Sequence, residues 1–296
     1  MLGDTAALRR KYGRYLLWQR LNVDQVPLPF VNELDKTYEE KGAKRVAINQ
    51  GQGGPSLSKR QATGQLCFRG VEPPKPTELA AREKYKNVQL QPAPCILFRG
   101  QGNISQEERD AYPSGLVVLF QKCAWVDRPV ALDWVDKVMK PFIEAERAAG
   151  VADQSARYLL FEDNLDAQKT PEYIEALRGI SIDDHKVPPN HTDEVQPIDR
   201  GLGRQVKIYL DQQMDAWLED DDNLERWEST ERGTALSASD RRILLANWYY
   251  KAVRKALQGD AKRKYFEHAG ALLTADGTDD DLIKLQAPPK GYKLAI

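Results

Sequence analysis

Three aspartates stand out by where the sequence places them. Asp24 lies between valines in a strand-like run, where aspartate is disfavoured. Asp163 ends a short apolar strand, and Asp199 follows Gln196 and Pro197 at the first turn of a predicted helix. Carboxylates can act in acid–base chemistry or as oxygen ligands for hard cations. On position alone, however, a role as a surface, cap or turn residue is the more common explanation for each.

Other kinds of catalytic machinery are poorly supplied. The sequence has no GxxxxGK(S/T) phosphate loop, no GxSxG nucleophile elbow, and neither HExxH nor zinc-finger spacing. Its three histidines are too few to favour three-histidine zinc chemistry. Its three cysteines are widely spread, which fits neither a disulfide framework nor a zinc site and indicates a reducing, intracellular compartment.

The composition is that of an ordinary globular chain with one or two domains. Among 296 residues, 43 Lys and Arg balance 44 Asp and Glu, which leaves a net charge of −1. This balance excludes a protein that is basic all over, but it allows a local nucleic-acid groove. The longest apolar run, residues 116–120, is far shorter than the roughly 20 residues of a membrane helix, so no membrane association is expected.

The pattern of elements favours a mixed α/β chain. Strands are predicted at residues 21–31, 44–49, 60–68, 94–98, 116–121, 157–161 and 180–183. Helices are predicted at residues 129–149, with a kink at Pro141, and at 170–178, 198–218, 237–257 and 263–269. Strands thus come first, then strands alternate with helices, and helices end the chain. The prediction is an α/β core over residues 1–218, with insertions near 70–94 and 99–115, and a helical C-terminal extension over 219–296.

Long stretches of the chain resemble one known family. LVVLFQKCAWVDRPVALDWVDKVMKP, LLFEDNLDAQ and VPPNHTDEVQPIDRGLGRQVK resemble the catalytic domain of pogo-type transposases, DDE superfamily endonucleases of the Tc1/mariner group. That family places an aspartate after a strand in a DN setting, and the next one in a Gln-Pro-x-Asp-x-Gly element. Here 199 − 163 − 1 = 35 residues separate the two. NVDQVPLPF resembles the strand of the first aspartate, and LSASDRRILLANWYYKAV and FEHAGALLTADGTDDDLI resemble the C-terminal extension.

The resemblance implies an RNase H-like fold, in which three antiparallel strands precede parallel strands that alternate with helices. It implies that Asp24 lies within the sheet, Asp163 at the end of the adjacent strand and Asp199 on a helix behind them. The three would hold two Mg²⁺ or Mn²⁺ ions about 4 Å apart, which cleave DNA and join the freed end to a target. Glu162 falls on the opposite face of its strand and is expected at the surface or in support of the site.

Basic residues near the third aspartate are candidates for DNA contact. Arg200, Arg204 and Lys207 follow Asp199 at helical spacing and could hold phosphates, although a solvated charged face explains them equally well. His191, in the preceding loop, is a further candidate. The resemblance also implies DNA as the partner, a possible homodimer on DNA ends and a nuclear location.

Two alternatives stay open. One is a catalytically dead transposase-derived module for DNA binding or interaction. The net charge favours it, and so do the 23 residues ahead of Asp24, where the family carries DNA-binding domains. On this view the chain is truncated, or those domains are encoded elsewhere or lost. The other alternative is an RNase H-like nuclease acting on RNA–DNA hybrids, against which the Gln-Pro-Ile-Asp element favours a transposase.

Overall fold

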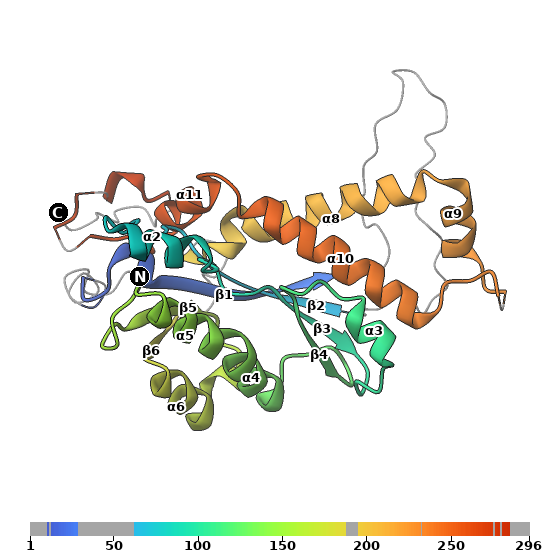
Figure 1. Ribbon diagram of the computed structural model, residues 1–296, viewed down its shortest axis with the longest axis horizontal. Helices are drawn as coiled ribbons and strands as arrows, with labels where there is room; N and C mark the ends of the chain where they lie inside the picture. Colours follow the sequence, from blue (N-terminus) through green and yellow to red (C-terminus); the bar gives the residue numbers. More distant parts are fainter. Residues whose placement is uncertain are drawn as a thin grey trace, which may run out of the picture.

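A mixed sheet forms the centre of the computed structural model, which describes residues 11, 13–28, 62–187, 195–231, 233–274, 276–278 and 280–284 (Figure 1). Within these ranges the sheet has six strands in the order β4-β3-β2-β1-β5-β6. The strands are β1 (Arg20–Leu28), β2 (Ala62–Arg69), β3 (Cys95–Arg99), β4 (Val117–Gln121), β5 (Tyr158–Glu162) and β6 (Ile182–Lys186). The first three pair antiparallel, whereas β5 and β6 run parallel to β1. The predicted RNase H-like mixed sheet is therefore confirmed, with β4 added parallel to β3 at one edge. The strand predicted at 44–49 lies outside the described residues.

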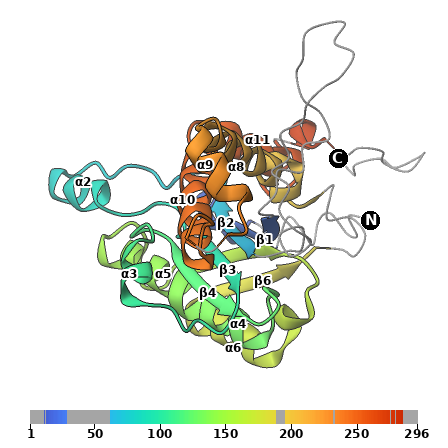
Figure 2. The same ribbon diagram turned by 90° about the vertical axis from the view of Figure 1, so that its right-hand side faces the viewer.

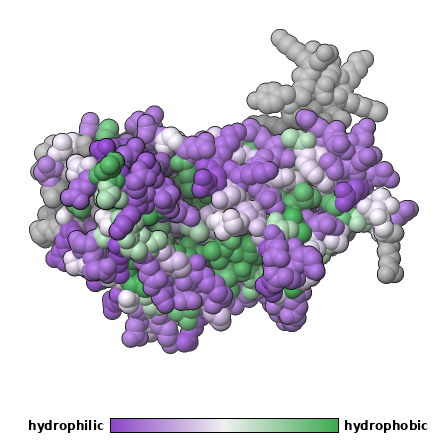
Figure 3. Space-filling view, viewed as in Figure 1, coloured by the Kyte–Doolittle hydropathy of each residue, from purple (hydrophilic) through white to green (hydrophobic). Residues whose placement is uncertain are grey.

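Helices cover both faces of this sheet (Figures 1 and 2). One layer contains α4 (Arg128–Trp134), α5 (Lys140–Ala148) and α6 (Pro171–Gly179), and the other contains α8 (Gly203–Leu218), α9 (Asp221–Glu228), α10 (Ala238–Ala256) and α11 (Ala261–His268). Short turns of helix lie at η1 (Leu17–Gln19), η3 (Asp166–Lys169) and η5 (Asp280–Leu282). The surface over the helices is mostly hydrophilic, and an apolar area lies between the two layers (Figure 3). In the described ranges no helix is long and apolar enough to cross a membrane.

Alternation along the strands directs side chains to the two layers. Leu21 and Val23 of β1 pack with the layer of α4, α5 and α6, whereas Val26 and Leu28 pack with the C-terminal helices. Both predicted insertions carry helices: α2 (Leu79–Lys86), which projects from the body in Figure 2, and α3 (Gln106–Asp110).

The helix predicted at 129–149 forms with an unexpected turn in its middle. Asp127 caps α4 by accepting a hydrogen bond from the Val130 amide at 3.1 Å. Between α4 and α5 the chain passes through a π-helical turn, η2 (Val135–Met139). Pro141, two residues after this turn, has no amide hydrogen to donate, so the wider turn takes the place of a sharp kink.

The C-terminal helices pack directly on the sheet. Ser237 and Asp240 form a reciprocal cap at the start of α10. In the same helix, the Tyr249 ring lies over Gly64 of β2, where an added Cβ would come within 2.7 Å of the ring. Residues on both sides of residue 218 thus share one hydrophobic core. The division into 1–218 and 219–296 stays a prediction.

A buried ion pair ties the middle of the sheet to α5. The Arg69 guanidinium makes two 2.9 Å contacts with the Glu146 carboxylate, and both side chains have no exposed surface. The Tyr158 hydroxyl donates a third bond to Glu146 at 2.7 Å. The guanidinium also stacks over Phe142, 4.8 Å from the ring centroid. The charges in this network are compensated, so removing one partner leaves the other charge buried and unpaired.

We therefore expect Glu146→Ala to destabilise the protein by about 3–5 kcal/mol. Glu144→Ala is the matched control, because Glu144 is exposed on the same helix, and it should change stability by less than about 0.5 kcal/mol. Urea denaturation followed by circular dichroism measures both. Equal effects of the two substitutions would show that the pair does not hold the sheet to α5.

The turn that carries Asp199 depends on a glycine. In the π-helical turn η4 (Ile198–Leu202), Gly201 has φ +155°, a conformation that residues with a Cβ rarely adopt. An added Cβ there would also lie 2.4 Å from Cε1 of Tyr265 on α11. Backbone strain and close packing therefore both require glycine at this bend.

We expect Gly201→Ala to cost about 1–3 kcal/mol of stability. Gly179→Ala should instead stabilise by about 0.5–1 kcal/mol, because Gly179 lies in a helix with nothing within 4 Å of the added Cβ. Thermal unfolding of the two variants compares them directly. If Gly201→Ala is as stable as the parent, η4 does not depend on this conformation.

Candidate active site

The pairing of β1 with β5 places the first two aspartates side by side. The parallel register joins Asn22 to Phe161. Asp24 and Asp163 each follow two residues later, so both project from the same face of the sheet. Neighbouring strands lie about 4.8 Å apart, which brings their side chains within reach of each other.

Two buried amides attach the third aspartate to the same strand. The Asn22 side chain has no exposed surface, donates to the Phe161 carbonyl at 3.0 Å and accepts from the Ile198 amide at 2.9 Å. The Gln196 side chain, equally buried, donates to the Val23 carbonyl at 3.4 Å. Because both contacts end on β1, the turn that leads into Asp199 is held against the strand of Asp24.

The three carboxylates influence one another. Burial raises the pKa of Asp24 to about 8, and the negative charges of Asp199 and Asp163 and a hydrogen bond with Asp199 act in the same direction. A bond from the Gln25 amide to Asp24 Oδ1, at 2.7 Å, opposes them. Asp24 therefore holds its proton to a higher pH than an isolated aspartate does, because a second carboxyl group lies against it.

The three aspartates lie near one another, but their carboxylates are not arranged as a metal-binding site. In the part of the chain that the structure describes, no three His, Cys, Asp or Glu side chains are arranged to hold a metal ion. Asp163 Oδ1 instead accepts a bond from the Asn164 amide at 2.6 Å, while the Asn164 side chain bonds to the Val187 carbonyl.

The predicted basic residues divide into three groups. Arg200 donates to the Lys284 carbonyl at 2.6 Å and so packs against the chain beyond α11. Arg204 and Lys207 are exposed on α8. His191 lies outside the described residues. The structure thus leaves two of the four candidates on an open face near the start of α8.

Glu162 is not the surface acid that one of our interpretations expected. Its side chain is completely buried, bonds to Lys186 and accepts from the Tyr173 hydroxyl at 2.8 Å. Burial raises its pKa to about 7, against the lowering effect of Lys186. The alternation of side chains along β5 predicts the face of Glu162 correctly, but α6 packs on that face and excludes solvent from it.

The role of Asn22 was missed from the sequence. The sequence does carry a signal for this role. Asn22 is a polar residue two positions before Asp24 and therefore lies on the same face of an apolar strand. Gln196, by contrast, belongs to the Gln-Pro-Ile-Asp element already singled out. Both residues position the aspartates and are themselves held by backbone contacts.

A comparison with protein families identifies a family to which the sequence of this chain is similar. Residues 89–258 match a family model described as DDE superfamily endonuclease. Among curated proteins, the comparison found no match.

Three solved structures of Mos1 transposase are similar in fold. The Mos1 paired-end complex with the left transposon end is 11% identical with a TM-score of 0.42, over 93% of this chain and 61% of that chain. The Mos1 mariner paired-end complex with Mn is 12% identical with a TM-score of 0.43, and the Mos1 strand transfer complex is 12% identical with a TM-score of 0.41. Each of these two covers 91% of this chain and 60% of that chain. This chain thus spans about three-fifths of the length of these structures.

The family match contains both Asp163 and Asp199 and begins downstream of Asp24. It extends over 258 − 89 + 1 = 170 of the 296 residues, which is more than half of the chain. The chain belongs to the DDE superfamily of endonucleases.

Proposed function

We propose that this chain is a transposase-type endonuclease and strand transferase of the pogo type, with Asp24, Asp163 and Asp199 as its metal ligands. The observation that carries the proposal is the contact between Asp24 and Asp199, residues 175 positions apart (199 − 24 = 175), next to the charge of Asp163. A protein that used these acids only as caps or turn residues would have no reason to bury one against another.

The donor set fits a divalent cation. All three groups are carboxylates, the oxygen ligands that Mg²⁺ and Mn²⁺ prefer. The raised pKa of Asp24 indicates negative charge without a counter-charge, which is what a cation would supply. A pair of such ions, when bound, lowers the pKa of an attacking water and stabilises the leaving oxygen of a phosphodiester.

The chain itself supplies position and rigidity. Asp24 and Asp163 are held by paired strands, and Asn22 and Gln196 hold the turn of Asp199. Fixed carboxylates avoid the reorganisation that a flexible site would need on each turnover. Arg204 and Lys207 extend from the helix that follows Asp199 and would contact the phosphates on either side of the reacting one.

Plasmid nicking with Mg²⁺ or Mn²⁺ tests this proposal. Asp163→Asn should lower the rate by at least about a hundredfold, because it removes a ligand without changing shape. Asp166→Asn is the control, since Asp166 lies three residues further along in the same segment and its side chain is fully exposed. It should keep the parental rate.

Other outcomes would point to the alternatives. DNA binding without nicking by the parent chain, in either metal, would contradict catalysis and favour a dead binding module. Faster cleavage of RNA–DNA hybrids than of duplex DNA would favour the RNase H-like nuclease. The homodimer on DNA ends and the nuclear location stay predictions of the family resemblance.

The raised pKa of Asp24 predicts that stability depends on pH in the absence of metal. Because the pKa of Asp24 rises from 3.8 to about 8 on folding, the folded chain binds the extra proton between these values. The free energy of unfolding should therefore fall as pH rises from about 4 to about 8. Glu162, whose pKa is raised to about 7, adds to the same fall.

Urea denaturation in EDTA across this pH range measures the effect. Asp24→Asn should lose the part of the slope due to Asp24 and should be more stable than the parent at pH 8. Asp166→Asn should keep the full slope. At pH 8, Mn²⁺ should stabilise the parent more than Asp24→Asn. Parallel pH profiles for parent and Asp24→Asn would show that Asp24 is ionised throughout.

A further inference from the structure

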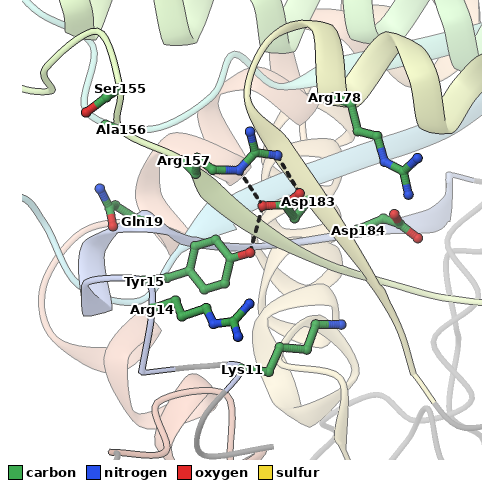
Figure 4. Close-up of a pocket in the computed structure, with 10 residues that line it drawn as sticks. All are labelled: Lys11, Arg14, Tyr15, Gln19, Ser155, Ala156, Arg157, Arg178, Asp183 and Asp184. Carbon is green, nitrogen blue, oxygen red and sulfur yellow. Dashed lines mark hydrogen bonds and ion pairs between the residues drawn. The ribbon is translucent and has the colours of Figure 1, made fainter.

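A second polar site lies at the opposite end of the strands from the three aspartates. It is a pocket of about 740 Å³ formed where β1, β5 and β6 begin (Figure 4). Arg157 precedes β5, whereas Asp163 follows it. Six residues of extended chain, at about 3.3 Å each, separate this pocket from the aspartates by roughly 20 Å. The pocket is therefore distinct from the candidate active site.

Positive charge predominates in this pocket. Four cationic side chains line it, from Lys11, Arg14, Arg157 and Arg178, against the two carboxylates of Asp183 and Asp184. The formal balance is 4 − 2 = +2. The four cations come from three parts of the chain. Lys11 and Arg14 precede β1, Arg157 precedes β5, and Arg178 lies in α6. Tertiary structure, and not a basic run in the sequence, gathers them.

One of the two carboxylates is already neutralised. Asp183 accepts two bonds from the Arg157 guanidinium, at 2.8 and 2.5 Å, and a third from the Tyr15 hydroxyl at 2.7 Å (Figure 4). These partners lower the pKa of Asp183, against the effect of burial, whereas burial and the bond to Asp183 raise the pKa of Tyr15 to about 12. Arg157 and Asp183 therefore form a fixed wall of the pocket whose charges cancel.

Within the described residues, none of the other three cations forms an ion pair with a carboxylate. Arg14 and Arg178 are exposed, and neither makes a hydrogen bond or ion pair with a residue in the described ranges. Lys11 bonds to Nδ1 of His185 at 3.0 Å, and burial lowers the pKa of that imidazole to about 4, so the histidine adds no charge to the pocket near neutral pH. Three cations thus face one remaining carboxylate, that of Asp184.

We propose that this pocket binds a phosphate group through Arg14, Arg178 and Lys11. A guanidinium fork matches two phosphate oxygens, and the two arginines approach from different elements. The phosphate belongs either to the backbone of DNA or to a small free phosphate compound. The first source rests on the proposed function. A duplex engaged at the aspartates would reach the pocket after about six base pairs, at 3.4 Å per pair, if it ran along β5.

Charge-matched double variants test the proposal. Arg14→Gln with Arg178→Gln removes two charges from the pocket. Lys122→Gln with Arg226→Gln removes two charges from exposed residues elsewhere, after β4 and on α9. One arm measures the affinity for a labelled duplex across a series of KCl concentrations. The other measures the thermal shift caused by pyrophosphate. Circular dichroism checks that both variants fold.

If the phosphate is that of DNA, the pocket variant should bind the duplex more weakly, and the slope of log affinity against log salt should fall by about 0.9, the loss expected for one phosphate contact. The control should match the parent. Asp184→Asn should bind more tightly, because it removes the carboxylate that competes with the ligand.

If the phosphate is that of a small compound, the duplex arm should not distinguish the two variants. Pyrophosphate should then raise the melting temperature of parent and control but not of the pocket variant. Equal behaviour of the two double variants in both arms would overturn the proposal. A parent chain that binds no DNA at all would contradict the proposed function, and the pyrophosphate arm would still decide the pocket.

Discussion

The candidate site depends on the hydrogen bonds made by the side-chain carboxamide of Asn22. This carboxamide is completely buried, and it joins the backbone of β5 to the first residue of η4 across β1. Without it, the buried amide of Ile198 would lose this bond, at a cost of about 1–3 kcal/mol. This penalty holds three segments in one arrangement, and an aspartate follows one or two residues after the contact in each segment.

The two faces of the sheet differ in whether their buried charged side chains are paired with an opposite charge. Beneath α5 and α6, the Arg69–Glu146 pair and the Glu162–Lys186 pair each bring opposite charges together. Asp24 is also largely buried, but its neighbours are further carboxylates, so burial and then their negative charges raise its pKa. Under the proposed function, this uncompensated acid is where a cation would bind.

Local pattern predicted most of the elements, and it failed where distant contacts decide. The short strand before Asp163 and the long helix after Ser237 form as expected, because an apolar run and a capping box are local signals. The acidic run after residue 218 carried no such signal, yet it contains α9. That helix is held by Trp227, whose ring packs against the rings of Trp217 and Trp248.

By itself, the sequence determined the element order, the fold class and the family, because apolar periodicity and the Gln-Pro-Ile-Asp element are written within short stretches. The three aspartates could also be named from it. Only the tertiary structure decided that Asp24 touches Asp199, that Glu162 is buried and that Arg14 and Arg178 share a pocket. These facts depend on strand register and on which layer covers each face, and register is set by the packing of residues far apart in the chain.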